Sequence, residues 1–333
     1  MKFYLVGIFL VFSCACAQVQ KIWIDTDVAM YDNKLLQYFH DVDDILALLH
    51  IVHVPNMKIE GIATLYGNAG HHRAFKSALK VVSEQNKNIP IYSGAKRSRY
   101  FKETEAQIAL IESLEKNDDL IIIALGPLTN IASVILKRPD LIPKIKNLIL
   151  VGGRRSEKFW KFKIGPKYIP DANIAHDIFS SDLVLKLLKK ITIVPFELAR
   201  QMFFDQYDME RLGNINEKMY EVRRQINPWF QLWKFVGEEG FNPFDLFAVG
   251  YVSHPHLFDC YGVEQYRLNQ LKLGMKKKDI LEVIELKQSK YARIQYCINI
   301  DQDFKYAFFE NLENSNGQGL VLDEDNLENT VRD

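Results

Sequence analysis

The chain has 333 residues, of which 48% are hydrophobic and 25% are charged. This composition is typical of a globular protein that can bury one large core or two modest ones. Lysine plus arginine and aspartate plus glutamate both number 42, so the formal net charge is zero. Since no excess of basic charge offers a surface to a polyanion, the composition argues against a nucleic-acid partner.

The first 17 residues have the character of an export signal. A lysine precedes an apolar run over residues 3–12 that is too short to span a membrane, and the stretch ends in the small-residue pattern Ala15-Cys16-Ala17. The alternative is a lipoprotein signal in which Cys14 carries the lipid. Either interpretation predicts an exported protein, secreted, periplasmic or lipid-anchored, with no transmembrane segment in the mature chain.

Two cysteines follow this region, Cys260 and Cys297. Two are too few for a disulfide scaffold. Because the sequence gives no distance between them, one bridge and two unpaired buried thiols remain equally open.

Short apolar segments alternate with helical patterns over the first two thirds of the chain. Strands are expected at residues 21–24, 59–65, 89–92, 120–125, 148–151 and 191–194. Helices are expected at residues 44–52, 74–84, 103–115, 128–137 and 177–189. Several strands are almost wholly apolar, as strands covered on both faces should be. The pattern predicts a doubly wound α/β fold with a mostly parallel open sheet, in a single domain over residues 18–312.

The last third mixes helices with late strands. We expect mostly helix over residues 205–240, a helix at 244–253, strands at 280–286 and 293–298 as a hairpin edge, and a helix at 301–312. The segment 313–333 is polar and acidic, so it is expected to be a poorly ordered tail.

Aspartates crowd around the first strand end and the first helix start. Asp25 and Asp27 follow the strand, at the carboxyl end where doubly wound sheets bind ligands, and Asp41, Asp43 and Asp44 precede the helix. Gathered in one cleft, these carboxylates would repel one another unless a positive charge lay among them. Either Asp43 or Asp44 taken alone could be an ordinary helix cap.

A further aspartate, Asp245, begins a second apolar helix after Pro243. Oxygen ligands from Asp27, Asp44 and Asp245 suit a hard divalent cation. Ca²⁺ is favoured over Mg²⁺ when a backbone carbonyl and substrate hydroxyls also join.

The motifs together resemble the inosine-uridine preferring nucleoside hydrolase family over roughly residues 22–255. The matching stretches, in order and approximate spacing, are IDTD with the following DVDD, GIATLYGN, IIALGPLTNIA, LVGG, PDAN and NPFDLFAVGY. The resemblance implies a Ca²⁺-dependent N-ribosyl hydrolase that takes small nucleosides and assembles as a homodimer or homotetramer.

The resemblance also implies roles for particular residues. Asp27 would be both metal ligand and general base, and Asp44, Asp245 and the main-chain carbonyl of Leu125 would complete the metal site. The ribose would be held by Asp43 and Asn68 at the 2′-hydroxyl, Asn173 at the 3′-hydroxyl and Asp171 at the 5′-hydroxyl.

The sequence departs from the family pattern near the metal site. The usual Pro-Gly after the first aspartates is replaced by Val28-Ala29, and the spacing to Asp43 is stretched by about the segment 31–39, which could be a lid or could block the cleft. Asp171 stands where the family often has glutamate.

Phe244 stands where many family members use a histidine to protonate the leaving base, and phenylalanine has no proton to donate. It could instead stack on the base, together with Trp229, Trp233, Tyr100 or Phe101, which favours purine nucleosides. Packing of these aromatic side chains in the core is the simpler alternative. The VGGRR stretch is interpreted as a tight turn with solvated Arg154 and Arg155.

The main prediction is therefore an exported nucleoside hydrolase. The alternative is a non-catalytic nucleoside- or ribose-binding protein that retains the Ca²⁺ site. A haloacid dehalogenase-type phosphatase also carries Asp-x-Asp, but it needs Thr or Val two residues after the second aspartate, where Ala29 stands.

Overall fold

The computed structural model describes residues 19–30, 40–85, 87–155, 163–164, 167–168, 171–273, 276–289 and 291–317. Three predictions lie outside the described residues. They concern the export signal, the inserted segment 31–39 and the tail beyond residue 317.

Ten strands of the described chain form one sheet in the order β3-β2-β1-β4-β5-β9-β12-β10-β11-β6. The strands are β1 (Gln20–Thr26), β2 (Met57–Thr64), β3 (Ile91–Ser93), β4 (Leu120–Ala124), β5 (Ile145–Val151), β6 (Arg154–Arg155), β9 (Ile191–Val194), β10 (Phe258–Leu273), β11 (Lys276–Lys287) and β12 (Ile294–Ile300); β7 (Lys163–Ile164) and β8 (Lys167–Tyr168) form a separate pair. Neighbours from β3 to β12 pair in parallel, whereas β10 is antiparallel to both of its neighbours. The mostly parallel α/β sheet predicted from the sequence is confirmed.

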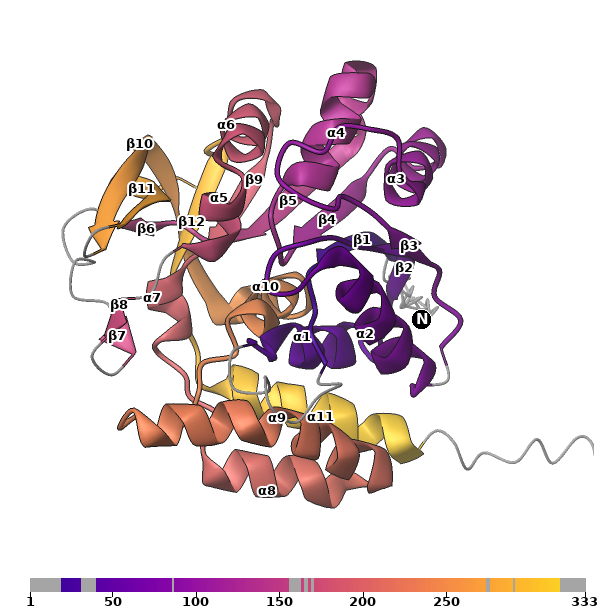
Figure 1. Cartoon of the computed structure of the whole chain (residues 1–333), viewed down its shortest axis with the longest axis vertical. Coiled ribbons are helices and arrows are strands. Elements are labelled where there is room, and N and C mark those ends of the chain that lie inside the picture. Colours follow the sequence, from indigo (N-terminus) through magenta and orange to yellow (C-terminus); the bar gives the residue numbers. More distant parts are fainter. Residues whose placement is uncertain are drawn as a thin grey trace, which may run out of the picture.

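Helices cover both faces of the sheet (Figure 1). They are α1 (Asp43–Ile51), α2 (His71–Ser83), α3 (Glu105–Lys116), α4 (Thr129–Lys137), α5 (Ala172–His176), α6 (Ile178–Leu187), α7 (Phe196–Ala199), α8 (Gln206–Ile215), α9 (Glu217–Phe235), α10 (Phe244–Ser253) and α11 (Asp303–Gly317). One core contains residues of α3, α4 and α6, and the other contains residues of α1, α2, α10 and the outer helices α8, α9 and α11. None of the described helices is both long and apolar enough to cross a membrane.

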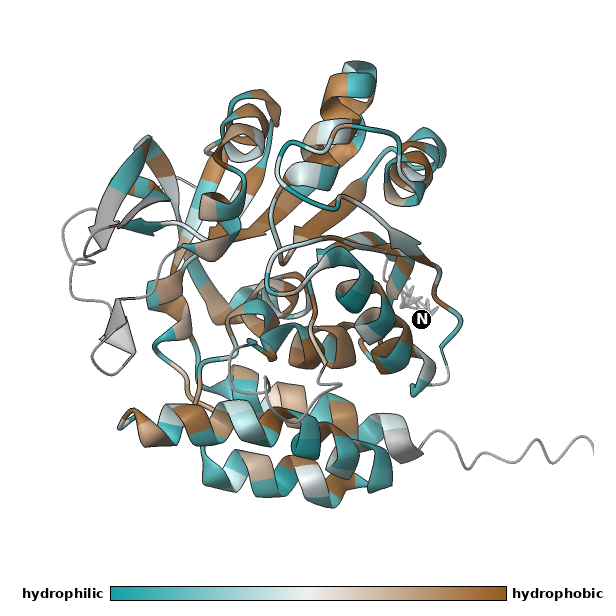
Figure 2. Cartoon of the chain, viewed as in Figure 1, coloured by the Kyte–Doolittle hydropathy of each residue, from teal (hydrophilic) through white to brown (hydrophobic). Residues whose placement is uncertain are grey.

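The central strands are apolar because both of their faces are covered. Every residue of β4, with the sequence LIIIA, is buried, and Figure 2 shows the middle of the sheet as a hydrophobic band between the helices. Each large aliphatic side chain buried in this way stabilises the fold by roughly 1.5–3 kcal/mol. The buried sheet therefore fixes the positions at which the loops leave its carboxyl edge.

The prediction that residues 280–286 and 293–298 pair with each other as a hairpin is wrong. These segments form β11 and β12, but the long strand β10 lies between them and pairs with both. The sequence did not reveal β10 because its pairing register shifts on both sides of Gln265. Each shift reverses which side chains face the core, so the simple alternation of a strand is broken.

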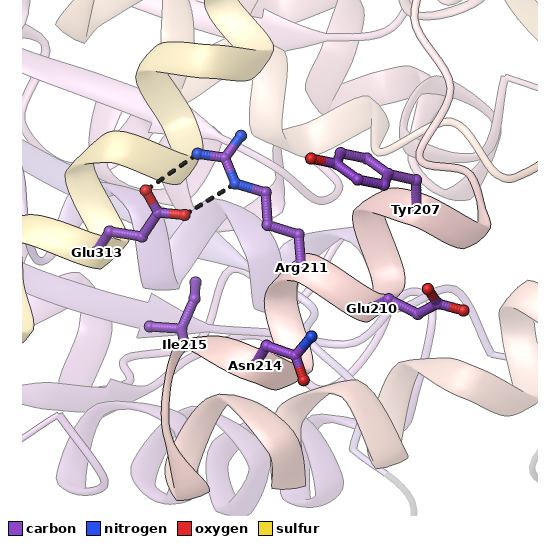
Figure 3. A pocket seen from close by; sticks show the side chains of 6 residues that line it. All are labelled: Tyr207, Glu210, Arg211, Asn214, Ile215 and Glu313. Atoms are coloured by element: carbon purple, nitrogen blue, oxygen red, sulfur yellow. Dashed lines mark hydrogen bonds and ion pairs between the residues drawn. The ribbon is translucent and has the colours of Figure 1, made fainter.

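The boundary of the predicted tail at residue 313 is also wrong, because α11 continues to Gly317. Glu313 accepts two hydrogen bonds from Arg211 of α8, with Nε to Oε1 at 2.8 Å and Nη2 to Oε2 at 3.0 Å (Figure 3). The pair borders a surface groove of about 460 Å³ between α8 and α11. None of the candidate site residues lines this groove.

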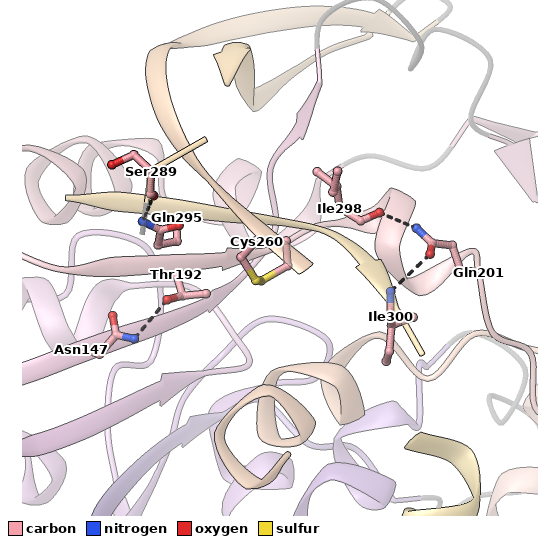
Figure 4. The surroundings of a disulfide bond; sticks show 9 residues. Asn147, Thr192, Gln201, Cys260, Ser289, Gln295, Ile298 and Ile300 are labelled. Carbon is pink, nitrogen blue, oxygen red and sulfur yellow. Dashed lines mark hydrogen bonds between the residues drawn. A yellow bond between two sulfur atoms is a disulfide. The ribbon is translucent and has the colours of Figure 1, made fainter. Parts of the chain in front are cut away.

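A disulfide joins Cys260 of β10 to Cys297 of β12, which resolves the alternative left open by the sequence (Figure 4). The two residues lie directly opposite each other in the antiparallel pair. Gln201 braces β12 nearby, since its amide donates to the carbonyl of Ile298 at 2.7 Å. The bridge therefore fastens the antiparallel part of the sheet to the parallel part.

Removing the bridge should destabilise the protein. The cysteines are 37 residues apart, and closing a loop of that length contributes about 4 kcal/mol by the chain-entropy relation. We expect the Cys260→Ala/Cys297→Ala double variant to unfold at a lower urea concentration than wild type. A reducing agent should lower the wild-type midpoint and leave that of the double variant unchanged; equal midpoints for wild type and variant would contradict the prediction.

Candidate metal and catalytic site

The candidate site forms where the loops after β1, β2 and β4 meet. The N–H of Leu65 donates to the carbonyl of Thr26 at 3.2 Å, and the N–H of Leu125 donates to the carbonyl of Asp25 at 2.8 Å. These bonds extend the parallel pairing past the strand ends. Asp27, the next residue of the β1 loop, is thereby held between the β2 and β4 loops.

Two glycines make room for the Asp27 side chain. A Cβ atom at Gly67 would lie 1.8 Å from Asp27 Oδ2, and one at Gly126 would lie 3.1 Å from Asp27 Cγ. A side chain at Gly67 would therefore collide with the carboxylate. The glycines of the GIATLYGN and IIALGPLTNIA stretches thus have a steric reason to be glycine.

The helices α1 and α10 begin side by side at this point. Asp43 joins them, because its Oδ2 accepts the N–H of Asp245 at 3.0 Å while its Oδ1 accepts the N–H of Asp44 at 3.1 Å. The hydroxyl of Thr26 donates to Asp44 Oδ1. Two helix N-termini thus direct their positive dipole ends at one group of carboxylates.

Carboxylate oxygens of Asp43, Asp44 and Asp245 all lie within 4.8 Å of one another, and the three residues are buried. Among the described residues, neither these aspartates nor Asp27 forms an ion pair with a basic side chain. A buried group of like charges without a counter-charge is costly, and a hard cation among the oxygens would relieve that cost. The donor set therefore fits a divalent metal ion. Asp44 and Asp245 come together as predicted, whereas the third predicted ligand, Asp27, is not one of these three residues and its role as a ligand stays a prediction.

The crowding of these carboxylates favours their protonated forms. Burial, opposed by the hydrogen bond from the N–H of Asn68 and aided by the charge of Asp43, raises the pKa of Asp27 to about 7. Burial also raises the pKa of Asp245, and the charges of Asp43, Asp44, Asp27 and Asp41 add to this effect. The pKa of Asp44 is raised first by burial and then by Asp27 and Asp43. The mutual effects show that Asp27 belongs to the same electrostatic group as the other three.

Asp25 does not join this group. Its side chain is fully buried, and its Oδ1 accepts the indole N–H of Trp23 at 3.1 Å. Residues two apart in a strand lie on the same face, so Asp25 points with Trp23 to the face of the sheet opposite Thr26. Burial raises its pKa to about 7.

The amides predicted to hold the ribose lie at the site but are engaged within the protein. The Asn173 side chain donates to the carbonyls of Leu125 at 2.9 Å and Val151 at 3.1 Å. The Asn68 side chain pairs with the backbone of Asp41, accepting from its N–H at 3.0 Å and donating to its carbonyl at 2.7 Å. Their contacts with ribose hydroxyls stay predictions. The role of the Leu125 carbonyl as a metal ligand also stays a prediction.

The prediction of a solvated Arg154 is wrong, because only 2% of this residue is exposed. Its guanidinium lies over the ring of Phe196, 5.2 Å from the centroid. Asp171 is fully buried nearby, and its Oδ2 accepts the N–H of Gly153 at 2.8 Å. Burial raises the pKa of Asp171, and the charge of Arg154 opposes this effect by lowering it. The sequence could not predict the burial of Arg154, because Asp171 and Phe196 are distant from it along the chain.

The expected aromatic group is brought together only in part. Phe244 packs against Phe196 at 4.9 Å and Trp233 at 6.3 Å between ring centroids, and Trp229 contacts Trp233 at 6.2 Å. Phe101 belongs to the core on the other face of the sheet. Phe244 thus has an aromatic wall beside Asp245, built from α7, α9 and α10.

Comparisons with known proteins identify the family of the chain. The family model of the inosine-uridine preferring nucleoside hydrolases matches residues 22–307. Uridine nucleosidase 1 of Arabidopsis thaliana is 26% identical over 270 residues, covering 72% of this chain and 75% of that protein. The pyrimidine-specific ribonucleoside hydrolase RihA of Shewanella baltica (strain OS185) is 24% identical over 271 residues, covering 70% of this chain and 82% of that protein.

The fold has solved counterparts. The purine-preferring ribonucleoside hydrolase from Gardnerella vaginalis aligns with a TM-score of 0.72 at 16% identity, covering 89% of this chain and 99% of that one. An inosine-guanosine nucleoside hydrolase aligns with a TM-score of 0.67 at 17% identity, covering 89% and 98%. Because the family model spans nearly all of the α/β domain, this chain belongs to the inosine-uridine preferring nucleoside hydrolases and is an N-ribosyl hydrolase.

Proposed function

We propose that this protein hydrolyses the N-glycosidic bond of ribonucleosides in a Ca²⁺-dependent reaction, with purine nucleosides preferred. The observation that carries the proposal is the convergence of buried Asp43, Asp44 and Asp245 at the starts of α1 and α10, without a counter-charge among the described residues and with the charge of Asp27 acting on Asp245. Asp27, Asp44, Asp245 and the Leu125 carbonyl would hold the cation. Ca²⁺ bound there would make a nearby water more acidic and would bind ribose hydroxyls.

Asp27 is suited to accept the proton of the attacking water. Its carboxylate is fixed by the N–H of Asn68 at 2.7 Å and by the two glycines beside it. In the reaction, water oxygen forms a bond to the anomeric carbon, its proton passes to Asp27, and the base leaves with the electrons of the glycosidic bond. The remaining carboxylates stabilise the positive charge that develops on the ribose.

The preference for purines rests on the aromatic wall around Phe244. A larger π-system gains more from stacking on phenylalanine and tryptophan side chains. Phe244 has no acidic proton, so the departing base must be a leaving group that does not depend on this residue for protonation. The names of the relatives point in both directions, since they include uridine- and pyrimidine-specific enzymes as well as purine-preferring ones.

We also propose that the protein is exported and forms a homodimer or homotetramer. The disulfide between Cys260 and Cys297 supports export, because such bonds persist in oxidising compartments. Fractionation of the source cells and light scattering of the pure protein would check the two proposals separately.

Turnover on a panel of nucleosides tests the main proposal. Release of reducing sugar is expected from inosine, adenosine and guanosine, with lower kcat/KM for uridine and cytidine. Asp27→Asn should lower kcat by about a hundredfold or more, the usual contribution of a general base, while the exposed Asp303→Asn should match wild type. Nucleoside binding without any sugar release would support the non-catalytic binding protein instead.

Calcium should stabilise the folded protein through the aspartate cluster. At a free concentration of 100 times Kd, a ligand that binds only the folded state stabilises it by about 2.7 kcal/mol. We expect Ca²⁺ to raise the Tm of chelator-treated wild type, Mg²⁺ to raise it less, and Asp245→Asn to lose the effect. An equal Tm shift in Asp245→Asn would exclude this residue as a ligand.

The metal-free protein should lose stability as the pH rises. Folded Asp25 keeps its proton up to about pH 7, whereas the unfolded residue releases it near the ordinary aspartate pKa of 3.8. Between these values the folded state binds more protons, so the free energy of unfolding falls with rising pH. In chelator, the loss between pH 5 and 8 should be smaller in Asp25→Asn than in wild type, by about 3 kcal/mol. Urea unfolding measures it, and equal losses would refute the assignment.

A further inference from the structure

The stretch between Asp27 and Asp43 is longer than the family pattern, yet one residue, Asn68, forms hydrogen bonds near both of its ends, to Asp27 and to Asp41. Both described ends of the stretch are fastened to α2. The N–H of Met30 donates to Ser77 Oγ at 2.8 Å, and Nη1 of Arg73 bonds Nε2 of His40 at 2.9 Å. Since Arg73 and Ser77 are four residues apart, they lie on one face of α2, one turn from each other.

The proton positions on His40 follow from the chemistry of its partners. A guanidinium can only donate, so the bond with Arg73 requires Nε2 of His40 to be an acceptor without a proton. The proton of the neutral ring is then on Nδ1, which donates to the carbonyl of Asn68 at 2.8 Å. Arg73 thus selects the tautomer in which His40 can hold Asn68.

Asn68 in turn forms hydrogen bonds on both sides of the site, to Asp27 and to Asp41. Its backbone N–H donates to Asp27 Oδ2 at 2.7 Å, and its side chain makes two hydrogen bonds to the backbone of Asp41. Asp41 in turn accepts the N–H of Val42 at 2.8 Å, directly before α1. A single residue, Asn68, therefore connects the β1 loop to the start of the helix that carries the other carboxylates.

We propose that Arg73 and His40 are positioning residues that hold Asn68 against the general base Asp27. His40 lies within the stretched spacing. Its hydrogen bonds to Arg73 and Asn68 therefore hold the end of the longer stretch close to the site. The effect on catalysis rests on the proposed function, whereas the restraint on Asn68 does not. A misplacement of the base by a fraction of an ångström to one ångström is expected to lower kcat by about tenfold to a hundredfold.

Four variants test the proposal. Arg73→Ala and His40→Ala remove the two partners. His40→Asn keeps a donor near the position of Nδ1 but cannot reach Arg73. Lys76→Ala removes an exposed positive charge from the same helix and serves as the matched control.

The kinetic result expected is a fall in kcat of about tenfold or more in Arg73→Ala and His40→Ala, with KM changed less than kcat. His40→Asn should fall less, Lys76→Ala should match wild type, and the double variant Arg73→Ala/His40→Ala should be no slower than the worse single variant because the residues act in one chain. Additive losses, or kcat values equal to wild type, would overturn the proposal.

A measurement without substrate separates this inference from the proposed function. Hydrogen exchange at the Asn68 amide, followed by mass spectrometry of a short peptide around it, should be faster in Arg73→Ala and His40→Ala and unchanged in Lys76→Ala. Nitrogen NMR of wild type at neutral pH should show His40 as the Nδ1–H tautomer. Unchanged exchange in both alanine variants, or the Nε2–H tautomer of His40, would refute the inference even if turnover is observed. Faster exchange would support the restraint on Asn68 even if no nucleoside is cleaved.

Discussion

The repulsion among buried aspartates is the constraint on which the rest of this structure depends. Asp43, Asp44 and Asp245 come together from the starts of α1 and α10, and Asp27 of the loop after β1 acts on them electrostatically; none of the four has a basic ion-pair partner among the described residues. Burial and mutual repulsion both oppose ionisation, as the raised pKa values of Asp27 and Asp245 show. A fold can retain such a group only if something else stabilises it, and helix N-termini, backbone N–H groups and a bound cation are the available means.

The fold supplies the first two of these means. The parallel sheet places the ends of β1, β2 and β4 next to one another, and two short helices begin where those ends meet. Asp43 spans the two helix starts, so the position of Asp245 depends on a hydrogen bond to a residue far earlier in the chain. The large apolar core beneath the helices keeps these starts in place, and a cation needs only to complete the arrangement.

The sequence predicted the sheet, most of its strands and the convergence of Asp44 with Asp245, because these follow from periodicity and from motifs of fixed spacing. It did not predict β10, whose register shifts hide the alternation of its side chains. It also placed Arg154 in solvent, since a buried charge becomes visible only when its opposite charges and its aromatic neighbour are located in space. Thr26 and His40 were missed for the same reason: their partners, Asp44 and Arg73, are distant in sequence, and a hydroxyl or imidazole alone signals little.

The internal hydrogen bonds of the site have a consequence for binding. Asn68 and Asn173 both use their side-chain amides on backbone groups of the protein. If these residues also bind ribose, each must either exchange a protein partner for a substrate hydroxyl or use the lone pair that remains on its oxygen. An exchange costs little when the new bond replaces the old one, but it would release Asp41 or the Leu125 carbonyl at the same moment. The Leu125 carbonyl accepts one hydrogen bond from Asn173 and keeps a second lone pair, so its proposed role as a metal ligand does not depend on such an exchange.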